Sequence, residues 1–188
     1  MNKSEIGNLT VAQLVNRYEI TAQGDKIQIS KYAVKRSGDR AENVLSVCAA
    51  RKPEILSHFA EIEARKRDAA KERERKIAAI PGLMELDAAY DDLARWQTEF
   101  SASFEGESGG GVGVRPKPSY DLVAMSKKYP AASAYRKARH EALKENYEIA
   151  AYGREAMKMI EDDPQNYAAA LEYMERENEA FVERHIWD

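Results

Sequence analysis

Aromatic and basic side chains occur together at short spacing between residues 129 and 140. This segment reads Tyr-Pro-Ala-Ala-Ser-Ala-Tyr-Arg-Lys-Ala-Arg-His, and eight of the ten tyrosines of the chain lie beyond residue 89. Aromatic rings stack on bases and cations attract phosphates, so the candidate contacts to nucleic acid in this segment are Tyr135, Arg136 and Arg139. The same tyrosines are also explained as the half-buried rim of a helical bundle, which is the simpler interpretation.

A second basic segment spans residues 26–36 and reads Lys-Ile-Gln-Ile-Ser-Lys-Tyr-Ala-Val-Lys-Arg. Its cations would form a basic wing beside short helices, as in winged-helix modules, and they are Lys26, Lys31, Lys35 and Arg36. Two observations count against DNA binding here. No clear second recognition helix is predicted before residue 53, and the sequence pI of about 5.8 is low for a DNA-binding protein.

The net charge of −3 conceals charges that are segregated along the chain. Residues 1–81 carry a net charge of +5, residues 82–107 carry −6, residues 108–144 carry +6 and residues 145–188 carry −8. These blocks either pair with one another when the helices pack or form a charged face for a partner. The acidic candidates for partner binding are Glu85, Asp87, Asp91 and Asp92 in one block, and Glu172, Glu175 and Glu179 in the other.

The residues that most often carry catalysis or bind metal have no recognisable arrangement. The histidines at positions 58, 140 and 185 are scattered, without metal-ligand spacing. The single cysteine, Cys48, is interpreted as a small buried apolar side chain. The glycine-rich residues 106–113 lack the lysine of a P-loop and follow a predicted helix, so they are interpreted as a linker. We expect no metal, no cofactor and no enzymatic activity.

The first 52 residues predict a small α-β-β-α unit. Thr10 and Gln13 form a capping box for a helix that runs to about residue 18. The alternating residues on both sides of Gly24 then predict a short β-hairpin, and residues 37–39 cap a second helix that carries Val44 and Val47.

Residues 53–104 predict an antiparallel helical hairpin about 40 Å long. Its first helix starts at Pro53 and has an exposed, charged middle at residues 65–76, and a break follows at residues 80–83. The second helix has apolar residues at spacings of three and four, typical of a coiled-coil seam: Leu83, Leu86, Tyr90, Leu93, Gln97, Phe100 and Phe104.

A Gly/Pro-rich linker or loop is predicted at residues 105–118, and a C-terminal helical bundle at residues 119–188. The predicted fold class is therefore mainly α (α+β). The chain begins without the apolar core of a signal peptide, and no run approaches the roughly 20 apolar residues of a membrane span. We expect a cytoplasmic protein with no membrane partner.

Three segments resemble a group of known proteins: Ala50-Arg-Lys-Pro-Glu-Ile-Leu56, Ile80-Pro-Gly-Leu83 and Glu183-Arg-His-Ile-Trp-Asp188. Their layout is similar to small accessory proteins encoded by phages and mobile elements of gut bacteria, some of which are anti-CRISPR inhibitors of Cas9. The resemblance implies a non-enzymatic inhibitor that binds Cas9 or its guide-RNA complex and blocks DNA recognition or cleavage.

Such an inhibitor would act as a DNA mimic, because acidic side chains would occupy the positively charged channels that hold nucleic acid. The acidic candidates named above would then make the contacts. The alternative function is a nucleic-acid-binding accessory protein that uses the basic segments. A third interpretation is an assembly protein that forms oligomers through the seam at residues 83–104.

Overall fold

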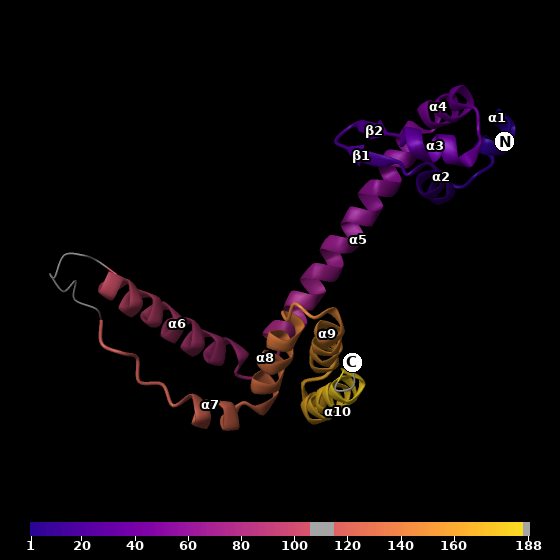
Figure 1. Ribbon diagram of the computed structural model, residues 1–188. Coiled ribbons are helices and arrows are strands. Elements are labelled where there is room, and N and C mark those ends of the chain that lie inside the picture. The colour runs from indigo at the N-terminus through magenta and orange to yellow at the C-terminus, as the bar shows by residue number, and fades with distance from the viewer. Residues whose placement is uncertain (106–114, 186–188) are drawn as a thin grey trace. The chain divides into compact units, whose positions relative to one another are not determined.

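The computed structural model describes residues 1–105 and 115–185, and side chains are described up to Ser103 and from Arg115 onward. In this part of the chain there are ten α-helices, a short 3₁₀ helix and a two-stranded sheet, which confirms the predicted mainly α fold (Figure 1). The chain divides into two compact units, Met1–Lys71 (unit 1) and Glu72–Asp188 (unit 2). Among the described residues, no helix has both the length and the apolar character needed to cross a bilayer.

Unit 1 contains more helices than the sequence predicted. Its elements are α1 (Lys3–Gly7), α2 (Val11–Tyr18), β1 (Thr21–Gln23), β2 (Lys26–Gln28), α3 (Lys31–Ser37), α4 (Ala41–Ala50) and the first part of α5 (Lys52–Ala78). The strands pair antiparallel with Ala22 opposite Ile27, and the turn between them places Gly24 at φ 61°. The predicted α-β-β-α order is therefore present, with α1 and α3 added to it.

Short polar motifs determine where the helices of unit 1 begin. The predicted capping box is present, because the Gln13 backbone N–H donates to Thr10 Oγ1 at 3.2 Å and the Thr10 N–H donates to Gln13 Oε1 at 2.8 Å. Ser30 caps α3 in a similar way, since its hydroxyl accepts from the Ala33 N–H at 3.2 Å. Gly38 ends α3 at φ 73°, a left-handed conformation that favours glycine.

The core of unit 1 lies between these short helices and the start of α5. Its buried members are Ile6, Leu14, Tyr18, Ile20, Val44, Val47, Cys48 and Ile55. Cys48 has no exposed surface, and burial raises the pKa of its thiol. The prediction that this cysteine is a buried apolar side chain is confirmed.

A buried carboxylate, Asp39, joins three parts of unit 1. Asp39 is 8% exposed and accepts hydrogen bonds from Tyr18 Oη at 2.9 Å and from Arg17 Nη2 at 2.8 Å. It also pairs with the N-terminal amine of Met1. Burial opposes the charge of Asp39, but these hydrogen bonds outweigh it and hold the pKa of the carboxyl well below its ordinary value.

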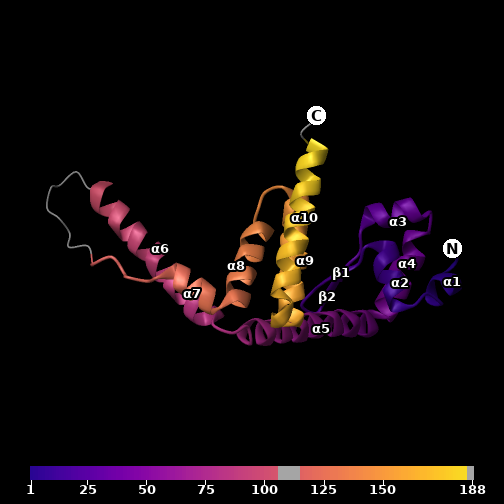
Figure 2. The same cartoon turned by 90° about the horizontal axis from the view of Figure 1, so that it is seen from below.

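Unit 2 contains a three-helix bundle. Its elements are the end of α5, α6 (Leu83–Glu105), α7 (Leu122–Lys128), α8 (Pro130–Ala142), α9 (Tyr147–Asp162), the 3₁₀ helix η1 (Pro164–Asn166) and α10 (Tyr167–His185). Helices α8, α9 and α10 pack on one another (Figure 2). Their shared core includes Ala138, Ala156, Met157, Ile160, Ala170 and Met174.

Helices α8 and α9 approach each other closely at Gly153. A Cβ atom at this position would lie 2.3 Å from the Ala142 backbone nitrogen and 2.7 Å from the Ala138 carbonyl oxygen. Ala138 itself has no exposed surface. Small residues on both helices therefore allow their backbones to pack side by side.

The break predicted at residues 80–83 is confirmed, because α5 ends at Ala78, α6 begins at Leu83, and Gly82 between them has φ 72°. The helix predicted to pack on α6, which the sequence placed at residues 53–80, is corrected by the structure. Within unit 2, the buried residues of α6 pack on α7 and α8, whereas the sequence assigned the seam to the helix over residues 53–80. The physical reason is composition: α8 offers a face of small alanines, while residues 65–75 of α5 are charged, polar or alanine and are exposed.

The predicted linker at residues 105–118 is only partly described. Residues 106–114, which include most of its glycines, lie outside the described residues. Residues that follow are held against α6: Trp96 Nε1 donates to the Arg115 carbonyl oxygen at 3.0 Å, and Lys117 lies 5.7 Å from the centre of the Trp96 ring. The described end of the segment is therefore attached to a helix.

Replacing Asp39 by asparagine is expected to lower the free energy of unfolding of unit 1 by about 2 kcal/mol, because the charged partner of Arg17 and of the N-terminus is lost. Urea unfolding followed through NMR signals of unit 1 checks this. The Asp25→Asn variant, at an exposed turn position, is the matched control.

The Asp39→Asn variant also tests how the stability of unit 1 depends on pH. Because the folded pKa of Asp39 is lowered, its stabilisation is present above the unfolded value of about 3.9 and is lost as the pH falls below it. Unit 1 of the unmodified protein is expected to lose more stability below about pH 4 than the Asp39→Asn variant does. Equal losses would contradict the assigned role of the carboxylate.

Replacing Gly153 by alanine is expected to destabilise unit 2 by about 2 kcal/mol, because the added methyl group would overlap the α8 backbone. This outcome reverses the usual preference of helices for alanine over glycine, which is about 1 kcal/mol. Thermal unfolding monitored by circular dichroism measures the effect. The Gly7→Ala control, where no atom lies within 4 Å of the new Cβ, is expected to show no loss.

Candidate functional site

Helix α3 presents most of the predicted basic residues of unit 1 on one exposed side. Lys31, Tyr32, Lys35 and Arg36 are exposed, and we call this group the α3 basic face. Ala33 lies on the opposite side of the helix and has no exposed surface. Lys26, the fourth basic candidate, is also exposed and begins strand β2.

The charges of the α3 basic face are largely unpaired within the protein. Arg36 pairs with Glu19 at 2.7 Å, and its guanidinium lies 5.7 Å from the centre of the Tyr32 ring. In the described part of the chain, Lys26, Lys31 and Lys35 make no ion pair within 4 Å. Tyr32 is 71% exposed, so its ring is available to a ligand.

The sequence interpretation missed α3 as a helix, and this is corrected by the structure. The signals that could have found it are Ser30, which caps its start, and Gly38, which ends it. Helix α3 packs against α2 and α4. The objection that unit 1 has no second helix before residue 53 to carry its basic residues is therefore removed.

Two of the four acidic candidates on α6 are occupied by contacts inside unit 2. Asp87 pairs with Arg136 and lies 3.6 Å from Arg139 Nη1. Asp92 accepts from Arg115 Nη1 at 2.6 Å, and this hydrogen bond lowers the pKa of the Asp92 carboxyl. The charge blocks at residues 82–107 and 108–144 therefore pair with each other at these positions.

The other two acidic candidates on α6, Glu85 and Asp91, are exposed. Neither makes an ion pair within 4 Å in the residues that the structure describes. Since Asp87 and Asp92 are neutralised by arginines, the four residues do not form one continuous acidic surface.

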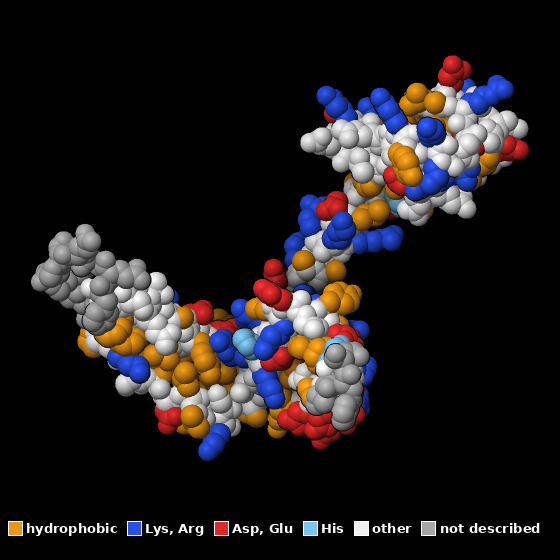
Figure 3. Space-filling model, viewed as in Figure 1, with side chains coloured by type: hydrophobic (Ala, Val, Ile, Leu, Met, Phe, Trp, Pro, Cys, Tyr) orange, Lys and Arg blue, Asp and Glu red, His pale blue; other side chains and the backbone are white. Residues whose placement is uncertain are grey.

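Helix α10 brings the remaining acidic candidates together. Glu172, Glu175 and Glu179 are exposed and lie on one side of the helix with Glu183, and we call these four residues the α10 acidic face. Ala170 and Met174 on the opposite side are buried in the bundle. Lys137 lies 4.0 Å from Glu175. Figure 3 shows acidic side chains gathered on this part of the bundle.

The predicted role of Tyr135 as a stacking residue is wrong. Its ring is 3% exposed, and its hydroxyl donates to Glu161 Oε1 at 3.0 Å. Burial, followed by the nearby Glu161 charge, raises the pKa of Tyr135 to about 12. The side chain therefore belongs to the core of unit 2, deeper than the half-buried rim that the sequence favoured.

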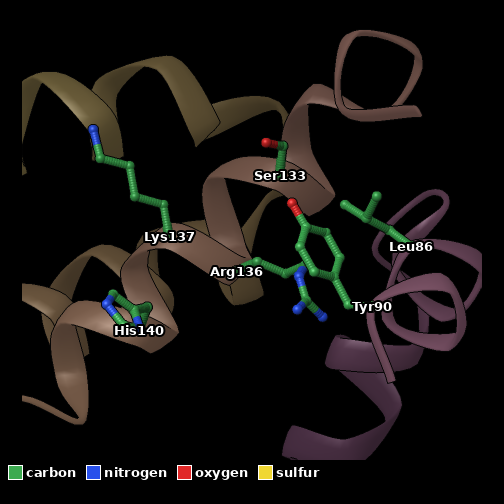
Figure 4. Close-up of a pocket in the computed structure, with 6 residues that line it drawn as sticks. All are labelled: Leu86, Tyr90, Ser133, Arg136, Lys137 and His140. Carbon is green, nitrogen blue, oxygen red and sulfur yellow. The ribbon is translucent and has the colours of Figure 1, made fainter. Parts of the chain in front are cut away.

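The two arginines predicted beside Tyr135 remain accessible. Arg136 lies against the Tyr90 ring, with its guanidinium 3.9 Å from the ring centre (Figure 4). Arg139 is exposed. The structure thus separates the predicted group, because the tyrosine points into the bundle and the arginines point toward α6 and solvent.

Comparison of the chain with known proteins found no match. No protein-family model matches the chain, and neither a curated protein nor a solved structure matches it. Among the described residues there is also no group of three histidine, cysteine, aspartate or glutamate side chains placed to hold a metal ion. The α3 basic face and the α10 acidic face are the predicted sites that the structure assembles.

Proposed function

We propose that the protein is a non-enzymatic nucleic-acid-binding accessory protein that uses the α3 basic face. The observation that supports this proposal is the exposure of Lys31, Tyr32, Lys35 and Arg36 on one side of a capped helix. Lysine and arginine supply the attraction to phosphates, and an exposed tyrosine supplies a surface for sugars or bases. The proposed place of action is the cytoplasm of a bacterial cell.

The packing of α3 fits this role. Helix α2 buries Leu14 and Tyr18, and α3 packs against it, as the first helix of a helix-turn-helix module supports the second. In this unit a short β-hairpin takes the place of the turn. The supported helix leaves its cationic side in solvent.

The net positive charge of unit 1 also favours binding to nucleic acid. Residues 1–71 carry 13 basic and 9 acidic side chains, whereas the complete chain is acidic. Exposed basic residues continue onto the part of α5 that belongs to unit 1, at Arg65, Lys66, Arg67 and Lys71. The low pI of the chain therefore arises from unit 2 and does not describe the surface proposed to bind.

The double variant Lys31→Ala/Lys35→Ala is expected to bind a short DNA duplex about tenfold more weakly than the unmodified protein at low salt, because two phosphate contacts are lost. The slope of log affinity against log salt is expected to decrease by about 2. Fluorescence anisotropy over a salt series measures both quantities.

The matched control is Lys127→Ala/Lys128→Ala in α7, which removes the same charge from exposed positions of unit 2. Equal weakening by the control would indicate attraction by total charge alone and count against the α3 basic face. Failure of the unmodified protein to bind single- or double-stranded DNA at low salt would reject the proposal.

A second candidate function, inhibition of a Cas9-like nuclease, is favoured by the α10 acidic face. Its four carboxylates lie along one exposed side of a helix, and only Glu175 has a cation, Lys137, at 4.0 Å among the described residues. Such a row could occupy a positively charged channel in Cas9 or in its guide-RNA complex, where phosphates would otherwise lie.

The triple variant Glu172→Gln/Glu175→Gln/Glu179→Gln is expected to require about tenfold more protein to inhibit DNA cleavage by Cas9, because complementary charge is removed. Glu85→Gln/Asp91→Asn is the control with exposed acids on α6. Normal cleavage by several Cas9 orthologues in excess unmodified protein would exclude this function.

A further inference from the structure

A recess lies between α6 and α8 in unit 2. Its larger part has a volume of about 350 Å³ and is lined by Leu86 and Tyr90 from α6 and by Ser133, Arg136, Lys137 and His140 from α8 (Figure 4). A smaller part of about 180 Å³ is lined by Arg136, Arg139, His140 and Leu143. The two parts are neighbours, because Arg136 and His140 line both of them.

Positive charge in the smaller part exceeds the negative charge that faces it. Arg136 and Arg139 both contact the same carboxylate, Asp87, so one carboxylate serves two guanidinium groups. Burial, followed by repulsion from Arg139, lowers the pKa of Arg136. An anion that enters this part of the recess would therefore be attracted by charge that the protein does not itself neutralise.

The cations are held in position by the surrounding structure. The Arg136 guanidinium lies 3.9 Å from the centre of the Tyr90 ring, which fixes its plane. Leu86 of α6 has no exposed surface, and the face of α8 that packs into the bundle consists of buried alanines and Tyr135. Lys137 extends away from the ring in Figure 4, and lies 4.0 Å from Glu175 on α10.

We propose that this recess binds a phosphomonoester, with the phosphate at Arg136, Arg139 and His140 and the organic part of the ligand against the Tyr90 ring. This site is separate from the α3 basic face and does not depend on the function proposed for it.

Charge favours phosphate over carboxylate at this position. A phosphomonoester carries a charge of about −1.5 to −2 at pH 7 and three acceptor oxygens, whereas Asp87 supplies a single charge and two oxygens. Two guanidinium groups and an imidazole present enough N–H donors for the phosphate oxygens. Phosphate therefore competes with Asp87 for the arginines, and Asp87 limits the affinity.

The larger part of the recess accounts for the organic group. Its volume lies within the range of small-molecule sites, and the partly exposed Tyr90 ring supplies an aromatic wall beside the Ser133 hydroxyl. Inorganic phosphate would leave this wall uncovered. A nucleotide is the natural probe, because its base and sugar combine apolar faces with hydroxyl groups.

Binding is tested by calorimetry with AMP, adenosine and inorganic phosphate on the full chain. AMP is expected to bind at least about tenfold more tightly than adenosine, since the charged hydrogen bonds require the phosphate. It is also expected to bind more tightly than inorganic phosphate. Equal affinity for AMP and adenosine, or no binding of AMP at millimolar concentration, would overturn the proposal.

Variants locate the site. Arg139→Ala and His140→Ala change exposed side chains and are each expected to weaken AMP binding about tenfold, while the fold measured by circular dichroism is unchanged. Asp87→Asn is expected to tighten binding, because it removes the internal competitor. Lys144→Ala, an exposed cation just beyond α8 that lines neither part of the recess, is the control. Equal weakening by this control would overturn the assignment.

A phosphomonoester occurs both in free nucleotides and at the 5′ end of a nucleic-acid strand. A 5′-phosphorylated oligonucleotide and the same strand with a 5′-hydroxyl distinguish these sources when they are compared with AMP in the Arg139→Ala variant. Tighter binding of the phosphorylated strand than of AMP, lost in the variant, supports the terminal phosphate as the ligand. Tighter binding of AMP supports the free nucleotide.

Discussion

The contacts of Asp87 with Arg136 and Arg139 join α6 to the bundle and also decide which charges of unit 2 face solvent. Further along α6, Asp92 is likewise neutralised by an arginine, Arg115. Because acids of residues 82–107 are neutralised in this way, α6 carries fewer free carboxylates than its sequence suggests. Glu85 and Asp91 stay unpaired on α6 within the described residues, α10 keeps its acidic face, and a positive excess is left beside α8.

The sequence alone predicted those structural features that depend on residues adjacent in the chain. Thr10 and Gln13 form the expected capping box, and the break near Gly82 lies where proline and glycine placed it. Helix α3 was missed because its seven residues are too short to show an apolar repeat, although Ser30 and Gly38 mark both ends. Local signals thus define helix ends more securely than periodicity defines short helices.

Contacts between distant segments could not be predicted in the same way. Asp87 and Arg136 are 49 positions apart, so no spacing rule connects them. The same limit applied to Tyr135 and to the seam of α6, since both depend on which helices pack together. The acidic and basic residues could be named as candidates from the sequence, but whether each is free or paired is a property of the folded chain.

Residues 65–75 of α5 are exposed; their contacts include the local pair of Glu72 with Arg75 at 2.7 Å and one long-range pair, Arg73 with Glu161 of α9 at 3.1 Å. No side chain in this stretch belongs to either core. Selection on it is therefore restricted mainly to helix propensity and charge, as in other surface helices. At the level of the gene, codon changes or a recombination joint in this stretch would disturb neither hydrophobic core.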